Sequence, residues 1–132
     1  AAAFNLVMAA FKLPKATTEE VQKRQDTIAR TTLDAAKVPL EVAQMALQVL
    51  ELIEQAAALG NLNAISDAGS GGALARAALT GAGLNVRINA ASLQNQQMAA
   101  PLLTELASIE AQASLLEEKI HRTIQERGGI SL

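Results

Sequence analysis

The sequence predicts an all-α protein, a multi-helix bundle of about five helices. Apolar residues recur with helical spacing along nearly the whole chain, and no β-branched run alternates at period two for long enough to form a strand. Half of the 132 residues are hydrophobic but only 2% are aromatic, so Ala, Leu, Ile and Val must build the core. Because this length supports one modest core, we expect residues 1–132 to form a single helical domain.

The first two helices are delimited by a proline and by a capping pattern. The helix from about Ala1 to Lys12 should end before Pro14, because proline disfavours helical dihedral angles in the preceding residue. Thr17 and Glu20 have capping-box spacing, which predicts a second helix from there to about residue 36. Its many charges are typical of a solvated outer helix. Opposite charges stand one turn apart in three pairs: Glu19 with Lys23, Glu20 with Arg24, and Asp26 with Arg30.

Pro39 suits the first turn of a third helix, where its missing N–H costs nothing. Between Leu40 and Leu59 the polar residues form a narrow stripe, and nearly everything else is apolar. Such a helix should be buried on most of its circumference, at the centre of the bundle. The stripe consists of Glu41, Gln44, Gln48, Glu51 and Gln55, with Glu54 beside it.

A fourth helix should follow the turn at Gly60, with Asn63 or Ser66 as its cap, and continue toward Asn89 despite several glycines. From about Gln96 the chain is again helical, and its apolar seam needs a partner helix from the same or a second subunit. The segment GGISL ends this helix. The seam consists of Leu102, Leu106, Ile109, Ala113, Leu116, Ile120 and Ile124.

Composition and charge exclude several classes of function. The net charge of −2 comes from scattered side chains without a basic stripe, so we expect no nucleic-acid partner. No apolar run reaches the roughly 18 residues that span a bilayer, so we expect no membrane insertion. The absence of cysteine fits a reducing compartment, and we expect a cytoplasmic protein. The chain starts with Ala in mid-helix, which suggests that a segment is missing upstream.

Common catalytic motifs are absent from the sequence. It contains no GxSxG, no GxxxxGK[ST] and no HExxH, and no second histidine completes a metal site, so we predict no metal ligands. The single histidine, His121, lies one turn after Glu117 among charged residues. A solvated histidine that pairs with Glu117 is favoured over a catalytic one.

The segment from Gly60 to Asn89 holds the candidates for chemistry. Asp67 falls in the first turn of a helix, where a carboxylate can serve as a capping acid or as a catalytic group. The glycines can let a neighbouring helix approach closely or can surround a ligand. Asn85 and Asn89, one turn apart, must face solvent, bond across an interface or bond a ligand, because burying them unpaired costs about 1–3 kcal/mol each.

This segment, GNLNAISDAGSGGALARAALTGAGLNVRIN, resembles the signature of the formiminotetrahydrofolate cyclodeaminase and methenyltetrahydrofolate cyclohydrolase family, with its GN.N..SD and NV.IN elements. AFNLVMAAFKLPKAT resembles the family's helix and turn ending in LPK, and KVPLEVAQMALQVLELIE resembles its VPL-led helix. The likeness extends from about Phe4 to Ile124. It implies a helical, cyclodeaminase-like homodimer with a folate site near the subunit boundary. The family closes formiminotetrahydrofolate with loss of ammonia, or opens methenyltetrahydrofolate with water. Neither reaction needs a metal or a permanently bound cofactor, because the tetrahydrofolate derivative is the substrate.

The resemblance also implies roles for individual residues. Asp67 becomes the candidate catalytic acid or base, a role typically worth about 10²–10⁴-fold in rate. Asn61, Asn63 and Ser66 would shape the turn beside the site, and Asn85 and Asn89 would bind the amide-like edge of the pterin. Lys15, or more weakly Arg87, would meet the folate's carboxylate tail, although both can equally be solvated surface charges.

One departure from the family concerns its N-terminal region, a glycine-rich turn and small-residue helices that this sequence does not contain. The chain would then correspond to the C-terminal two-thirds of a cyclodeaminase-like domain, with apolar surface left for another chain to cover. The prediction is a folate-dependent one-carbon enzyme. The alternatives are a non-catalytic, truncated helical dimerisation or interaction module of the same ancestry, and a binder of small ligands without turnover.

Overall fold

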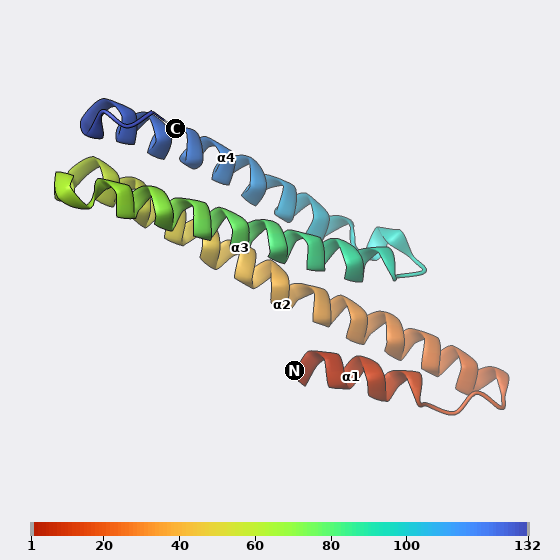
Figure 1. Ribbon diagram of the computed structural model, residues 1–132. Helices are drawn as coiled ribbons and strands as arrows, with labels where there is room; N and C mark the ends of the chain where they lie inside the picture. The colour runs from red at the N-terminus through yellow and green to blue at the C-terminus, as the bar shows by residue number, and fades with distance from the viewer. Residues whose placement is uncertain (1, 132) are drawn as a thin grey trace.

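The computed structural model describes residues 2–131, which form helices joined by short turns (Figure 1). The all-α prediction is confirmed, and the four α-helices of this part of the chain come close to the five expected. Ala1 and Leu132, which fall in predicted end segments, lie outside the described residues. The elements are α1 (Ala2–Phe11), α2 (Thr18–Leu59), the 3-10 helix η1 (Leu62–Ala64), α3 (Ile65–Ala91), the 3-10 helix η2 (Gln96–Met98) and α4 (Ala100–Gly128).

The three long helices α2, α3 and α4 lie side by side, and α1 runs along the N-terminal part of α2 (Figure 1). The core lies between the long helices, where Leu50 of α2, Leu79 of α3 and Leu106 of α4 are fully buried. A smaller cluster around Leu93 closes the end of the bundle near η2. Among the described residues, no helix is both long enough and apolar enough to cross a membrane.

The start of α2 has the predicted capping box. The hydroxyl of Thr17 accepts a hydrogen bond from the Glu20 amide at 3.2 Å, and the Glu20 carboxylate accepts one from the Thr17 amide at 3.2 Å. The prediction of three charge pairs on this helix is wrong within the described residues. The Glu20 carboxylate is used in the capping box. Arg24 instead donates to the Phe11 carbonyl at 3.1 Å, and Asp26 accepts a hydrogen bond from the side-chain amide of Gln22 at 2.9 Å.

The prediction of a helix boundary at Pro39 is wrong, because α2 continues from Thr18 to Leu59 without interruption. A proline inside a helix removes one backbone hydrogen bond and usually kinks or ends it. Here Ala36, Leu40 and Ala43, which lie on both sides of the proline, are buried against the bundle. Their packing keeps the helix continuous. Packing therefore overrides the local cost of the proline.

The second half of α2 is less buried than its narrow polar stripe predicts. One side packs in the core, but another carries a row of large apolar side chains that are 41–64% exposed. The row follows a spacing of four and three residues: Val38, Val42, Met45, Val49 and Leu52. The expectation of uncovered apolar surface on this helix is confirmed, and its coverage by another chain stays a prediction.

The turn between α2 and α3 depends on Gly60, where a Cβ atom would overlap the carbonyl oxygen of Ala56. Arg127 of α4 closes the end of α2 by donating to the carbonyl oxygens of Ala57 and Gly60. The predicted caps of α3 are wrong: its N-cap residue is Ala64, which forms no side-chain hydrogen bond. A 3-10 turn intervenes, and Asn61 caps it instead.

The glycines at the start of α3 allow close helix packing, which is one of the two predicted reasons for them. A Cβ atom on Gly69 would lie 3.0 Å from Ile124, and one on Gly71 would lie 3.3 Å from Ile53. Gly72 is buried between Ile53 and Ile120. Small residues therefore bring α3 close to both α2 and α4.

The predicted seam of α4 faces the bundle. Its residues from Leu106 to Ile124 are buried or pack against the core, so the seam finds its partner helices within the same subunit. The helix ends at Gly129, whose left-handed φ of 65° is a conformation that glycine adopts without strain.

Candidate functional site

The predicted site residues lie mostly along α3, but at its two ends. Asn61, Asn63, Ser66 and Asp67 stand at or before its start, whereas Asn85 and Asn89 lie near its end. At 1.5 Å per residue, Asp67 and Asn85 are about 27 Å apart along the helix. Within one chain, the structure therefore does not bring all of these residues together.

Asp67 is exposed in the first turn of α3. Because Ala64 offers no side-chain cap, the free N–H groups of this turn and the positive end of the helix dipole favour an anion here. Asn61 accepts a hydrogen bond from the Asn63 amide at 3.0 Å and so fixes the preceding turn. Ser66 borders a hollow of about 370 Å³ between the start of α3 and the end of α4.

At the other end of α3, Asn85 and Asn89 border a groove of about 500 Å³ between α1, α2 and α3. The groove is mainly apolar, and sequence reasoning missed the residues of α1 and α2 that form its walls. Their only signal in the sequence is helical periodicity, which core residues share. These walls include Phe4, Val7, Val38, Pro39 and Val42.

The amides of Asn85 and Asn89 have a defined orientation. The side-chain nitrogen of Asn85 donates to the Gly81 carbonyl at 2.9 Å, and that of Asn89 donates to the Asn85 carbonyl at 2.9 Å. Each side-chain amide therefore donates one N–H to a backbone carbonyl of the helix, and its oxygen can still accept a hydrogen bond. Two acceptors one turn apart beside an apolar groove can bind a flat molecule that carries neighbouring N–H donors.

The two predicted partners of a folate tail differ in the structure. Lys15 is exposed in the turn between α1 and α2. Arg87 forms a bidentate ion pair with Glu110 of α4, with both nitrogen to oxygen distances at 2.7 Å. This pair holds the guanidinium on its own chain, so Lys15 is the better of the two candidates.

The Arg87 to Glu110 pair predicts a small pH dependence of stability. The hydrogen bonds from Arg87 lower the pKa of Glu110 from its ordinary 4.5, against a smaller opposing effect of burial. A lowered pKa in the folded state means that the contribution is complete above the ordinary pKa and disappears as the pH falls through the lowered one. Because Arg87 is half exposed, solvent screening limits the pair to about 0.2–1 kcal/mol.

We therefore expect Glu110→Gln to be less stable than the native protein by about 0.2–1 kcal/mol near neutral pH, and equally stable in strong acid. Urea unfolding of both proteins at the two pH values measures this. Arg87→Met serves as the partner variant in a double-mutant cycle, in which the coupling should vanish in acid. A difference that persists unchanged in acid would contradict the assignment to this ion pair.

His121 is exposed on α4, as predicted, but its expected pairing with Glu117 is not formed. The Glu117 carboxylate instead lies 3.3 Å from Arg76 of α3, which also donates to the Ser114 hydroxyl at 3.1 Å. An arginine on the adjacent helix is a stronger partner for a carboxylate than a solvated histidine. This cluster links α3 to α4 and has a structural role.

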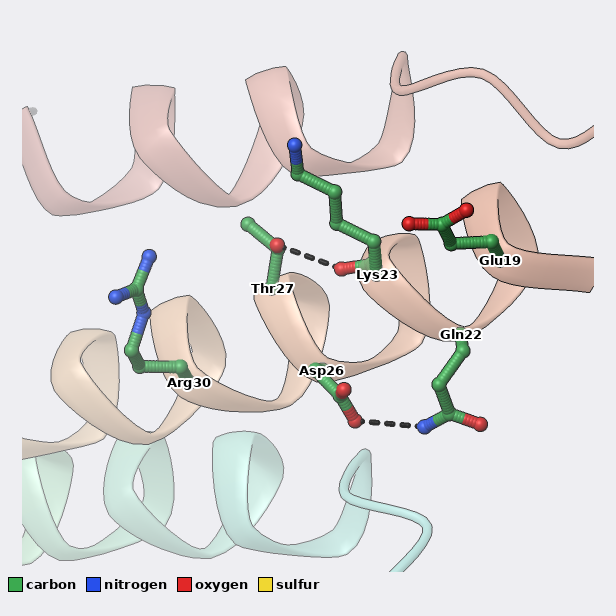
Figure 2. Close-up of a pocket in the computed structure, with 6 residues that line it drawn as sticks. All are labelled: Glu19, Gln22, Lys23, Asp26, Thr27 and Arg30. Atoms are coloured by element: carbon green, nitrogen blue, oxygen red, sulfur yellow. Dashed lines mark hydrogen bonds between the residues drawn. The ribbon is translucent and has the colours of Figure 1, made fainter.

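A polar hollow of about 460 Å³ lies on the first half of α2 (Figure 2). All the residues that line it belong to this one helix, and its hydrogen bonds run along the helix, from Gln22 to Asp26 and from Thr27 to the Lys23 carbonyl. Figure 2 shows Asp26 and Arg30 pointing in different directions, without a common centre. The hollow is a solvated helix surface and not a site.

Comparisons with known proteins give one consistent family. Residues 1–108 match the sequence model described as formiminotransferase-cyclodeaminase. The chain is 40% identical over 125 residues to a methenyltetrahydrofolate cyclohydrolase of Methylorubrum extorquens, an alignment that covers 95% of this chain and 60% of that protein. It is 34% identical over 89 residues to a formimidoyltransferase-cyclodeaminase of Rattus norvegicus, covering 67% of this chain and 16% of that protein. The chain thus spans less than two thirds of the length of either relative.

Proposed function

Because residues 1–108 match its sequence model, this chain belongs to the formiminotransferase-cyclodeaminase family, and we propose that it acts on a one-carbon unit carried by tetrahydrofolate. The substrate would be a formimino-, methenyl- or formyl-tetrahydrofolate. Among the family's reactions, the opening of methenyltetrahydrofolate by water has the stronger support. The relative named for that reaction matches more of this chain, at higher identity, than the cyclodeaminase does.

The groove at the end of α3 supports a pterin as ligand. A pterin is a flat ring system whose aminopyrimidinone edge carries neighbouring N–H donors. The free amide oxygens of Asn85 and Asn89 can accept from such donors, and the apolar walls from α1 and α2 suit the faces of the ring. Lys15 would attract the carboxylate tail, and Asn61, Asn63 and Ser66 would position the turn that carries Asp67.

In the proposed reaction, the oxygen of water forms a bond to the bridging carbon of the methenyl group, and one of the two carbon–nitrogen bonds of the bridge breaks. One proton of the water ends on the released nitrogen, and the other passes to solvent. Asp67 would act as the base that takes the proton from the attacking water. In the cyclodeaminase reaction, the protonated carboxyl group of Asp67 would donate a proton to the departing ammonia.

We also propose the remaining properties that the family implies. The chain would form a single domain, the C-terminal two-thirds of a cyclodeaminase-like unit, would pair into a homodimer and would work in the cytoplasm. The folate would be a substrate and not a permanently bound cofactor.

A second candidate function is a non-catalytic helical dimerisation module. It is supported by the uncovered apolar row on α2. A protein of this kind would keep the helical packing without turning over a folate.

Ultraviolet absorbance distinguishes the two functions, because methenyltetrahydrofolate has an absorption band that its open product lacks. We expect purified protein to accelerate the loss of this band in proportion to its concentration, above the spontaneous rate in the same buffer. Heat-denatured protein is the control. If the rate of absorbance loss at high protein concentration equalled the spontaneous rate, the result would contradict the proposed enzyme activity and favour the non-catalytic dimerisation module.

A further inference from the structure

One buried polar side chain of the bundle has no hydrogen-bond partner. Thr32 of α2 is 6% exposed and is the only buried polar residue in the part of the chain that the structure describes. Its hydroxyl forms no hydrogen bond with any other described residue. Buried polar groups are nearly always hydrogen-bonded, because an unpaired one has lost its bonds to water. This exception needs an explanation.

The backbone of α2 does not satisfy Thr32. A helical threonine commonly donates to the carbonyl four residues earlier, as Thr27 and Thr80 do here at 2.7 Å and 3.0 Å. For Thr32 that carbonyl belongs to Ile28, which instead accepts from the Thr31 hydroxyl at 3.2 Å. The Thr32 hydroxyl is therefore available to a partner outside the helix.

Thr32 stands where two hollows of the surface meet. It lines the groove of about 500 Å³ that Asn85 and Asn89 border, and also a second hollow of about 180 Å³ formed by α1, α2 and the segment after α3. Within residues 2–131, the one unpaired side-chain atom that is completely enclosed belongs to Arg76. The Thr32 oxygen is thus not sealed in the core, and the surface that it keeps opens into these hollows.

The other polar side chains of the groove already have partners. Apart from Thr32, its lining contains only three polar residues, Asn85, Asn89 and Ser92. Each of them donates one hydrogen bond to a backbone carbonyl of α3, at 2.9 Å, 2.9 Å and 2.7 Å. Thr32 is the only one of the four whose hydrogen-bonding group is unused within the described residues.

We propose that the Thr32 hydroxyl is a ligand-binding group of this groove and donates a hydrogen bond to the carbonyl oxygen on the aminopyrimidinone edge of a pterin. The assignment rests on the proposed function. That edge carries N–H donors, which suit the amide oxygens of Asn85 and Asn89, and beside them one carbonyl oxygen, which needs a donor. A hydroxyl can rotate its hydrogen toward such an acceptor.

This role predicts opposite effects of one substitution on stability and on binding. Thr32→Val removes the hydroxyl but keeps the branched shape, and valine and threonine have similar helix propensities. Because the hydroxyl has no partner in the fold, Thr32→Val should have a Tm equal to or above that of the native protein. The same variant should bind a reduced folate less tightly.

Calorimetric titration with 5-formyltetrahydrofolate, a stable reduced folate, measures the binding. We expect the Kd of Thr32→Val to rise by about 3- to 10-fold, the usual effect of losing one neutral hydrogen bond. Thr32→Ser keeps the hydroxyl and should bind like the native protein. Thr31→Val is the matched control, because its hydroxyl bonds the backbone one residue away and lines neither hollow. Its Kd should also equal the native value.

Each contrary result has a distinct meaning. If Thr32→Val bound as tightly as the native protein, or if Thr32→Ser were equally weakened, the hydroxyl would not be the contact, and the proposed function would stand. A clearly lower Tm of Thr32→Val without ligand would show that the hydroxyl is used by the fold, which would also overturn the assignment. Absence of binding by the native protein would overturn the proposed function, and the role of Thr32 with it.

Discussion

Replacement of Asp67 by asparagine is expected to lower the rate of methenyltetrahydrofolate hydrolysis by about 10²–10⁴-fold, the usual contribution of a positioned acid or base. Asparagine keeps the size of the side chain and its ability to accept a hydrogen bond, but it cannot take or give the proton. The carboxylate is exposed and forms no ion pair within the described residues, so its loss removes only its interaction with the start of α3, worth about 0.3–1 kcal/mol. Helix content and oligomeric mass should therefore be unchanged.

The measurement is the steady-state rate at saturating substrate, with circular dichroism and sedimentation of the same samples. Glu118→Gln is the matched control, because it removes an exposed carboxylate from α4, and its rate should equal that of the native protein. Native activity in Asp67→Asn would mean that a group other than Asp67 transfers the proton. Equal losses in both variants would point to a general effect of charge.

Features encoded by neighbouring residues could be predicted from the sequence. The capping box of Thr17 and Glu20 needs only a spacing of three residues, and the hydrogen bonds formed are the expected ones. The seam of α4 depends on the periodicity of one helix, and its residues are buried or pack against the core. The turn at Gly60 likewise follows from a local conflict with the backbone of Ala56.

Features that depend on distant residues could not be predicted. Pro39 remains inside α2 because the helix packs along its length against the bundle, and no local pattern encodes that support. Arg24 and Glu117 find partners far along the chain, at Phe11 and Arg76, in place of the expected neighbours one turn away. Arg87 is similarly held by Glu110, which lies 23 residues later.

In the candidate site, too, features encoded by neighbouring residues could be predicted, and features that depend on distant residues could not. The sequence predicted one helix through the glycines toward Asn89, and α3 is that helix. The resemblance implied one site for Asp67, Asn85 and Asn89, whereas α3 is continuous over 27 residues and holds Asp67 away from both asparagines. The groove beside the asparagines also uses walls from α1 and α2, which only the folded chain brings together.

Replacement of Gly72 by leucine is expected to destabilise the protein by about 1–3 kcal/mol, the usual cost of overpacking a core. Gly72 is buried where α3 meets both neighbours, and a Cβ atom there would lie 3.7 Å from Ile120 and 3.9 Å from Ile53. One carbon fits at these distances, but the further carbons of leucine do not. The helices would have to separate along the interface that the glycines bring close.

Gly72→Ala is the control at the same position, and it isolates size from backbone effects. Alanine makes only ordinary van der Waals contacts there and favours the helix by about 0.5–1 kcal/mol over glycine, so its stability should equal or exceed that of the native protein. Urea unfolding followed by far-ultraviolet circular dichroism measures both variants. If leucine proved as stable as alanine, the contact between α3 and α4 would be loose, and close packing would not explain this glycine.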